Sequence, residues 1–199
     1  MEERVKSLVV ERPGRLSIET RAIPEPASGE IRIKVERAGI CGSDIHILHG
    51  SNPFARYPRV IGHEFFGRID KLGDGVHARL GARIVVDPVV ACGTCYPCSV
   101  GRPNVCAQLA VLGVHRDGGF SEYACVPAEN AHLLPDSVGD DKAPLVEPFS
   151  IASARMDGWQ AASMISVGFT PASARAAGRA VCAVLMTRSA PLFRAASIR

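Results

Sequence analysis

The sequence predicts a mainly β fold, arranged as a small barrel or sandwich, followed by a terminal segment of different composition. Apolar and charged residues alternate strictly across residues 30–36, as in a strand with one buried face. Further short apolar runs recur through the first 150 residues and are separated by Gly and Pro. The composition then changes sharply near Ile151. With 199 residues, 47% of them hydrophobic and 22% charged, the chain has the composition of a globular protein.

The elements follow from these patterns in chain order. The expected strands cover residues 6–10, 16–18, 30–36, 64–72, 83–87, 120–126 and 132–134. Residues 43–49 leave room for one or two helical turns, and residues 140–147 form a second helical candidate. Residues 73–78 match G-x-G-x-x-A by letters, but a strand is expected from about Arg83. We therefore interpret this segment as a β-turn and not as a nucleotide-binding loop.

Charge and targeting signals exclude several classes of protein. The net charge of +3 is too weak to indicate a nucleic-acid partner. Residues 151–199 hold six Arg and one Asp, a net +5, so residues 1–150 carry −2. No apolar run reaches the ~18 residues of a membrane helix, and the acidic start lacks a signal-peptide core. We expect a cytoplasmic protein without a membrane partner, in which the seven Cys bind metal in preference to forming disulfides.

Four of the cysteines have the spacing C-x2-C-x2-C-x7-C, at Cys92, Cys95, Cys98 and Cys106. Four thiolates in one short lobe can close a tetrahedral shell around Zn²⁺, which indicates a structural zinc site. Four unrelated core cysteines are one alternative, and an iron–sulfur cluster is another. The last spacing does not fit a ferredoxin run, and Ala107 stands where such a run has Pro.

A second candidate site combines three separate segments. Cys41, His63, Glu64 and Glu147 are all residue types that ligate zinc, and three protein ligands with one open position are typical of catalytic zinc. Taken singly, Cys41 and His63 are equally compatible with core positions. His63-Glu64 does not begin a zincin helix, because Gly67 occupies the place of the second His.

The motifs together resemble the zinc-dependent medium-chain dehydrogenases, and within them the polyol and sugar-acid branch of sorbitol, idonate and galactonate dehydrogenases. The resemblance extends in order over about residues 5–152 and implies a GroES-like β-barrel catalytic domain with short helices and a zinc lobe. It is carried by G-I-C-G-S-D-I-H at 39–46, Y-P-R-V-I-G-H-E at 57–64, the lobe at 92–106, G-G-F-S-E-Y at 118–123 and V-E-P-F at 146–149.

The resemblance implies a role for each matching residue. Cys41 and His63 correspond to catalytic zinc ligands, Glu64 to the third ligand of the polyol branch, and Glu147 to a glutamate near that zinc directly or through water. With the lobe, this makes two zinc ions per chain. The implied substrate is a small alcohol or polyol, whose hydroxyl the zinc polarises for hydride transfer to NAD(P).

Two further residues correspond to the proton path of the family. Ser43 matches the hydroxyl that hydrogen-bonds the substrate alcohol, and His46 matches the residue that passes its proton towards solvent. A structural alternative for Ser43 is the N-cap of the short helix that follows.

The family holds NAD(P) in a Rossmann domain directly after the Glu-Pro segment, and residues 151–199 contain no G-x-G-x-x-G. Their length leaves room for about one βαβ unit of ~30 residues. We therefore expect a catalytic domain at 1–150 and an aberrant Ala/Arg/Ser-rich tail at 151–199, as in a truncated or frame-shifted product. The chain by itself is expected to lack the nucleotide site and dehydrogenase activity.

Three functional hypotheses stay open on the sequence alone. The first is the catalytic domain of a zinc-dependent alcohol, polyol or sugar-acid dehydrogenase. The second is a zinc-binding remnant without catalysis, and the third is a regulatory or interaction protein built on the same barrel. A homo-oligomer is compatible with all three.

Overall fold

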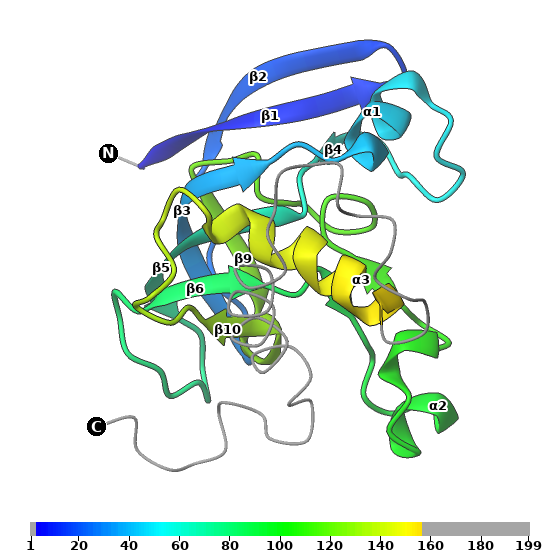
Figure 1. The fold of residues 1–199 in the computed structure, drawn as a ribbon. Coiled ribbons are helices and arrows are strands. Elements are labelled where there is room, and N and C mark those ends of the chain that lie inside the picture. Colours follow the sequence, from blue (N-terminus) through cyan, green and yellow to red (C-terminus); the bar gives the residue numbers. More distant parts are fainter. Residues whose placement is uncertain (1–2, 157–199) are drawn as a thin grey trace.

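The computed structural model describes residues 3–156, and Figure 1 shows a set of strands with α1 and α2 at the edges and α3 in the middle of the view. The elements are β1 (Arg4–Arg12), β2 (Arg15–Ala22), β3 (Glu30–Gly39), α1 (Gly42–His49), β4 (Arg59–Val60), β5 (Glu64–Leu72), β6 (Arg83–Val86), β7 (Val89–Val90), α2 (Tyr96–Ser99), η1 (Pro103–Val105), β8 (Ala110–Val111), β9 (Tyr123–Pro127), η2 (Ala128–Asn130), β10 (Ala131–Leu133), η3 (Ala143–Leu145) and α3 (Val146–Met156).

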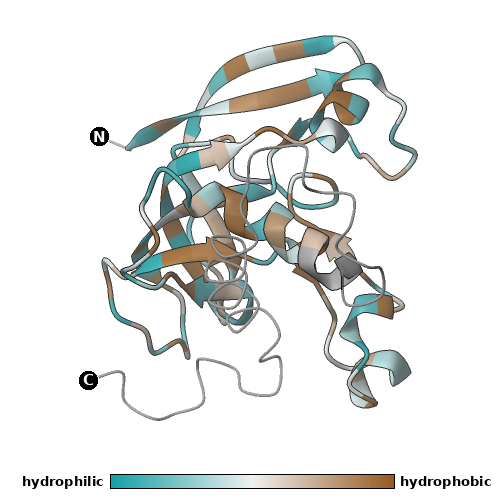
Figure 2. Cartoon of the chain, viewed as in Figure 1, coloured by the Kyte–Doolittle hydropathy of each residue, from teal (hydrophilic) through white to brown (hydrophobic). Residues whose placement is uncertain are grey.

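A five-stranded antiparallel sheet in the order β10-β6-β5-β3-β9 forms the centre of the fold. Alternating residues of β3, Ile31 and Ile33, are fully buried, as the sequence predicts. They pack with Phe65, Ile84 and Val126 from the neighbouring strands in the largest core cluster. Figure 2 shows the corresponding apolar colouring along β6.

A second sheet, in the order β2-β1-β4, joins α1 to the fold. Val10 of β1 and Ile47 of α1 are fully buried and pack with Ile61 and Val114. This cluster fixes α1 beside the segment that leads from β4 to β5. It therefore holds together two of the segments that carry the candidate site residues.

The register between β3 and β5 brings the same two segments into contact. Gly39, the last residue of β3, lies opposite Glu64, the first residue of β5. Cys41 follows Gly39 by two residues, and His63 immediately precedes Glu64. The end of this strand pair therefore positions the chain that continues into α1.

The cysteine-rich lobe projects from the sheets and contains α2 and η1 (Figure 1). Its two ends are joined by the antiparallel pair β7 and β8, with Val89 opposite Val111 and Val90 opposite Ala110. Cys92 follows the end of β7 by two residues, and Cys106 precedes the start of β8 by four residues. The short ladder thus closes the lobe at its base.

The strand predictions are confirmed in existence and order, with some errors in their bounds. Residues 64–72 match β5, whereas β9 begins at Tyr123 and not at residue 120. Residues 120–122 pair instead with β1, through the Glu122 N–H to Lys6 carbonyl bond of 3.1 Å and the Leu8 N–H to Phe120 carbonyl bond of 2.7 Å. The segment 73–78 is a turn without a following helix, as expected.

The second helical prediction is wrong in its bounds. Residues 140–147 are only partly helical, because the 3-10 turn begins at Ala143 and the α-helix spans Val146–Met156. Val146 is buried against Phe66 and Val85, so packing on the sheet decides where this helix begins. The predicted boundary at 150/151 falls within α3, and most of the predicted tail, residues 157–199, lies outside the described residues. Within residues 3–156 no helix is long and apolar enough to cross a membrane.

Candidate functional site

The four lobe cysteines converge, with their sulfur atoms all within 4.8 Å of one another. The Sγ atoms of Cys95 and Cys98 are 3.4 Å apart, and those of Cys95 and Cys106 are 3.7 Å apart. A tetrahedron with Zn–S bonds of ~2.3 Å has edges of about 3.8 Å. All four thiols are free, so their spacing fits a shared metal and not disulfides.

Backbone amides around the lobe favour thiolates. The backbone N–H groups of Cys92 and Gln108 both donate hydrogen bonds to Sγ of Cys106, each with an N to Sγ distance of 3.3 Å. Hydrogen bonds from the amides of Thr94 and Cys95 lower the pKa of Cys92 to about 6. Burial and hydrogen bonds with the thiols of Cys95 and Cys106 raise the pKa of Cys98 to about 12, so the polypeptide favours the thiolate at Cys92 but not at Cys98. Thiolate is the form of cysteine that ligates a metal, and the backbone donors at Cys92 and Cys106 fit a zinc site.

The second group consists of Cys41, His63 and Glu64, whose ligand atoms also lie within 4.8 Å of one another. Glu64 is buried, and the other two side chains are partly buried. The β3–β5 register and the core contact of α1 bring these residues together across more than twenty positions of sequence. One sulfur, one ring nitrogen and one carboxylate oxygen form a donor set that fits zinc.

Gly39 makes room for the Glu64 carboxylate. A Cβ at Gly39 would lie 2.5 Å from Oε2 of Glu64 and 3.2 Å from its Cβ. These distances are shorter than van der Waals contact, so any larger residue would displace the carboxylate from its place in the group.

Asp44 supports the second group and is a residue that the sequence analysis missed. It is almost fully buried in α1, and its carboxylate accepts the N–H of Cys41 at 2.9 Å and the N–H of Gly62 at 3.1 Å. Its Oδ1 lies 3.8 Å from Nδ1 of His63. Asp44 thus ties the Cys41 segment to the His63 segment, as outer carboxylates do around metal ligands. An acid three residues after the helix N-cap was the available signal.

Two buried polar atoms beside the group have no hydrogen-bond partner among the described residues. They are Oγ of Ser43 and Nδ1 of His63. Buried polar atoms are normally paired, so both point to a ligand or solvent partner at this site. The N-cap of α1 is Cys41, so the N-cap alternative for Ser43 is wrong.

His46 lies later in α1 and faces a different partner. Its Nδ1 is 3.0 Å from Oγ of Ser51, a residue the sequence analysis did not single out. Ser51 follows Gly50, which ends the helix in the left-handed conformation at φ 77°. Gly50 therefore lets the chain turn back so that Ser51 reaches the His46 ring.

Glu147 is placed near the group but does not belong to it. The three-residue set has its ligand atoms within 4.8 Å of one another without Glu147. Burial, followed by the nearby carboxylates of Glu64 and Asp87, raises the pKa of Glu147 to about 7. A bound cation would reduce the electrostatic repulsion between these carboxylates. This is a second indication that the site fits a metal.

The fold and the two candidate metal groups together correspond to the GroES-like β domain of the zinc-type alcohol dehydrogenase family. The sequence profile of the alcohol dehydrogenase GroES-like domain matches residues 27–136, more than half of the chain. The chain belongs to this family, as its motifs predict.

Individual relatives agree with this assignment. Starvation-sensing protein RspB of Escherichia coli K12 is 63% identical over 150 residues, covering 75% of this chain and 44% of the relative. L-galactonate-5-dehydrogenase of the same strain is 45% identical over 148 residues, covering 73% and 43%. The crystal structure of an alcohol dehydrogenase, rspB, from E. coli CFT073 with NADH has a TM-score of 0.73 and 61% identity, covering 78% and 45%. The chain spans less than half the length of these relatives.

Proposed function

We propose that this chain carries the metal-binding catalytic part of a zinc-dependent dehydrogenase that oxidises an alcohol or polyol with NAD(P). One observation carries the proposal. The ligand atoms of Cys41, His63 and Glu64 converge within 4.8 Å, and the buried hydroxyl of Ser43, two residues from Cys41, has no hydrogen-bond partner among residues 3–156. A substrate hydroxyl at this site would provide that partner.

The chemistry divides between the metal and the side chains. Zinc, when bound, supplies Lewis-acid polarisation of a substrate oxygen. Cys41, His63 and Glu64 would hold the zinc ion. Glu147 is near enough for the charge of Glu64 to act on its carboxyl group. The lobe cysteines would hold a second zinc with a purely structural role, which makes two per chain.

The hydroxyl of Ser43 can accept the proton of a substrate hydroxyl in a hydrogen bond and thereby orient it. His46 provides an imidazole for proton exchange with solvent. The Ser51 hydroxyl holds Nδ1 of that ring at 3.0 Å, which leaves Nε2 as the atom that exchanges the proton. We assign residues 3–156 no role in holding the nucleotide.

The substrate class follows from resemblance. L-galactonate-5-dehydrogenase is among the relatives, and the presence of Glu64 matches the polyol branch. We therefore propose a secondary alcohol on a sugar-derived chain. The lobe requires reduced cysteines, so we place the protein in a reducing compartment such as the cytoplasm. Exposed apolar side chains at Ile40, Phe54 and Tyr96 support self-association.

Cobalt substitution tests this function in the chain as it stands. Co²⁺ in the Cys/His/Glu site should change its visible spectrum when imidazole or sorbitol is added, because a catalytic site exchanges a ligand at its open position. Ser43→Ala should weaken the response to sorbitol about tenfold and leave that to imidazole unchanged, whereas Ser28→Ala should change neither. A site that binds Co²⁺ but responds to neither ligand would favour the non-catalytic zinc-binding hypothesis.

A further inference from the structure

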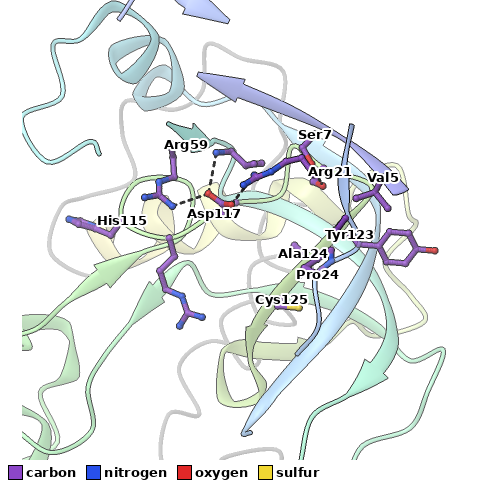
Figure 3. A pocket seen from close by; sticks show the side chains of 15 residues that line it. Val5, Ser7, Arg21, Pro24, Arg59, His115, Asp117, Tyr123, Ala124 and Cys125 are labelled. Atoms are coloured by element: carbon purple, nitrogen blue, oxygen red, sulfur yellow. Dashed lines mark hydrogen bonds and ion pairs between the residues drawn. The ribbon is translucent and has the colours of Figure 1, made fainter. Parts of the chain in front are cut away.

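A cavity of about 620 Å³ opens where the two main sheets diverge, and Figure 3 shows its lining. β1 is hydrogen-bonded to residues 120–122, just before β9, and the two strands separate beyond that point. The cavity is lined from β1, β2, β4, β9 and the loop around Asp117. Its volume is in the range of ~300–1,000 Å³ that is typical of small-molecule sites.

One carboxylate in this cavity holds two guanidinium groups side by side. Oδ1 of Asp117 accepts from Nη1 of Arg59 at 2.8 Å, and Oδ2 accepts from Nη1 of Arg21 at 3.0 Å (Figure 3). A single negative charge cannot neutralise both. Glu19 forms a second and weaker ion pair with Nε of Arg21 at 4.0 Å, which offsets part of the remaining positive charge. Arg59 has no acidic partner other than Asp117 among residues 3–156.

The same two guanidinium groups keep unused donors. Each can donate five hydrogen bonds. Apart from Asp117, Arg59 donates only from Nε to the Arg56 carbonyl at 3.3 Å. Neither Nη2 has a hydrogen-bond partner among residues 3–156. The Arg59 side chain is only 17% exposed, so its orientation is fixed before any ligand arrives.

We propose that this cavity binds a small organic anion, with carboxylate or phosphate oxygens on the guanidinium groups of Arg21 and Arg59. Planar guanidinium groups match such oxygens in bidentate geometry. Asp117 positions the two arginines and sets the affinity, because its charge opposes that of the ligand. The site shares no residue with the two candidate metal groups, so it does not depend on the proposed dehydrogenase function.

Calorimetry and amide NMR on the 199-residue chain test the proposal, with inorganic phosphate and citrate as probes at constant ionic strength. Arg59→Gln and Arg21→Gln should each weaken binding about tenfold, because each removes a charge-assisted hydrogen bond. Asp117→Asn should tighten binding several-fold. Amide shifts should concentrate at Val60, Asp117 and Gly118. Comparing the two probes shows whether phosphate or carboxylate is preferred.

Two charge-matched controls separate a built site from general electrostatics. Arg15→Gln changes the net charge by the same amount as the two arginine variants, and Asp136→Asn by the same amount as Asp117→Asn. Both residues lie outside the cavity lining. The Arg21 side chain lies at the rim of the cavity and is 43% exposed, so its substitution should not disturb folding. The Arg21 variant therefore tests the site even if the Arg59 variant does not fold. If the control variants change the affinity as much as the cavity variants do, or if the amide shifts spread over the surface, the site holds an adventitious ion only. That result, or no binding of either probe, overturns the proposal.

Discussion

At Gly39 the main chain passes so close to Glu64 that a methyl group would lie 2.5 Å from the carboxylate oxygen. Gly39→Ala should therefore push Glu64 out of the metal group and weaken zinc binding there by about 10–100-fold. Competition with a fluorescent zinc chelator measures this affinity.

Gly42→Ala is the matched control, because a Cβ at Gly42 meets nothing within 4 Å. This variant should bind zinc as the unmodified chain does. Equal affinity in the Gly39 and Gly42 variants would show that Glu64 is not a ligand or that the strand pair adjusts without cost.

Metal-ligand residues could be predicted from the sequence more readily than the residues that position them. Cys41, His63 and Glu64 are recognisable because few residue types bind zinc and their motifs are specific. Asp44 and Ser51 act through geometry that only the folded chain creates. Asp44 accepts the N–H of Gly62, eighteen residues away, and Ser51 reaches His46 only because Gly50 reverses the chain.

At the scale of elements, alternation and turn residues predict the strands well, since their period is short and local. β5 matches its prediction from end to end. The start of α3 could not be predicted, because it is decided by the burial of Val146 against Phe66 and Val85, which lie far away in sequence. The β3–β5 register, with its irregularity between Val35 and Arg37, is likewise a tertiary property.

The β7–β8 pair closes the cysteine lobe, and neither α2 nor η1 contains a buried residue. If the lobe binds zinc as proposed, zinc should therefore supply most of its folding free energy. Cys95→Ser should remove one zinc and lower the stability by several kcal/mol, measured by chemical unfolding.

Cys125→Ser provides the control for that experiment, since Cys125 is a free thiol outside both candidate metal groups. It should keep the full zinc content. A stable Cys95→Ser chain with unchanged zinc would rule out the structural role of the lobe. Visible absorption and iron in the purified protein would support the iron–sulfur alternative instead.

For the molecule as a whole, we predict no specific binding of NADH or NADPH to this chain and no oxidation of sorbitol, L-idonate or galactonate. A pyrophosphate needs backbone N–H groups at a helix N-terminus behind a glycine-rich loop. No loop between a strand and a helix in residues 3–156 carries G-x-G-x-x-G, and residues 157–199 lack that motif. Micromolar NADH binding by calorimetry would contradict this prediction.

We propose that this domain holds two zinc ions in separate sites, one closed by four cysteines and one open at Cys41, His63 and Glu64. Metal analysis of the purified chain and of its His63→Ala variant distinguishes the two sites. We predict two zinc ions per chain in the first and one in the second, with that zinc still bound by the lobe thiolates. A single zinc in the unmodified chain, or loss of both ions on replacing His63, would show that the two sites are not separate zinc sites.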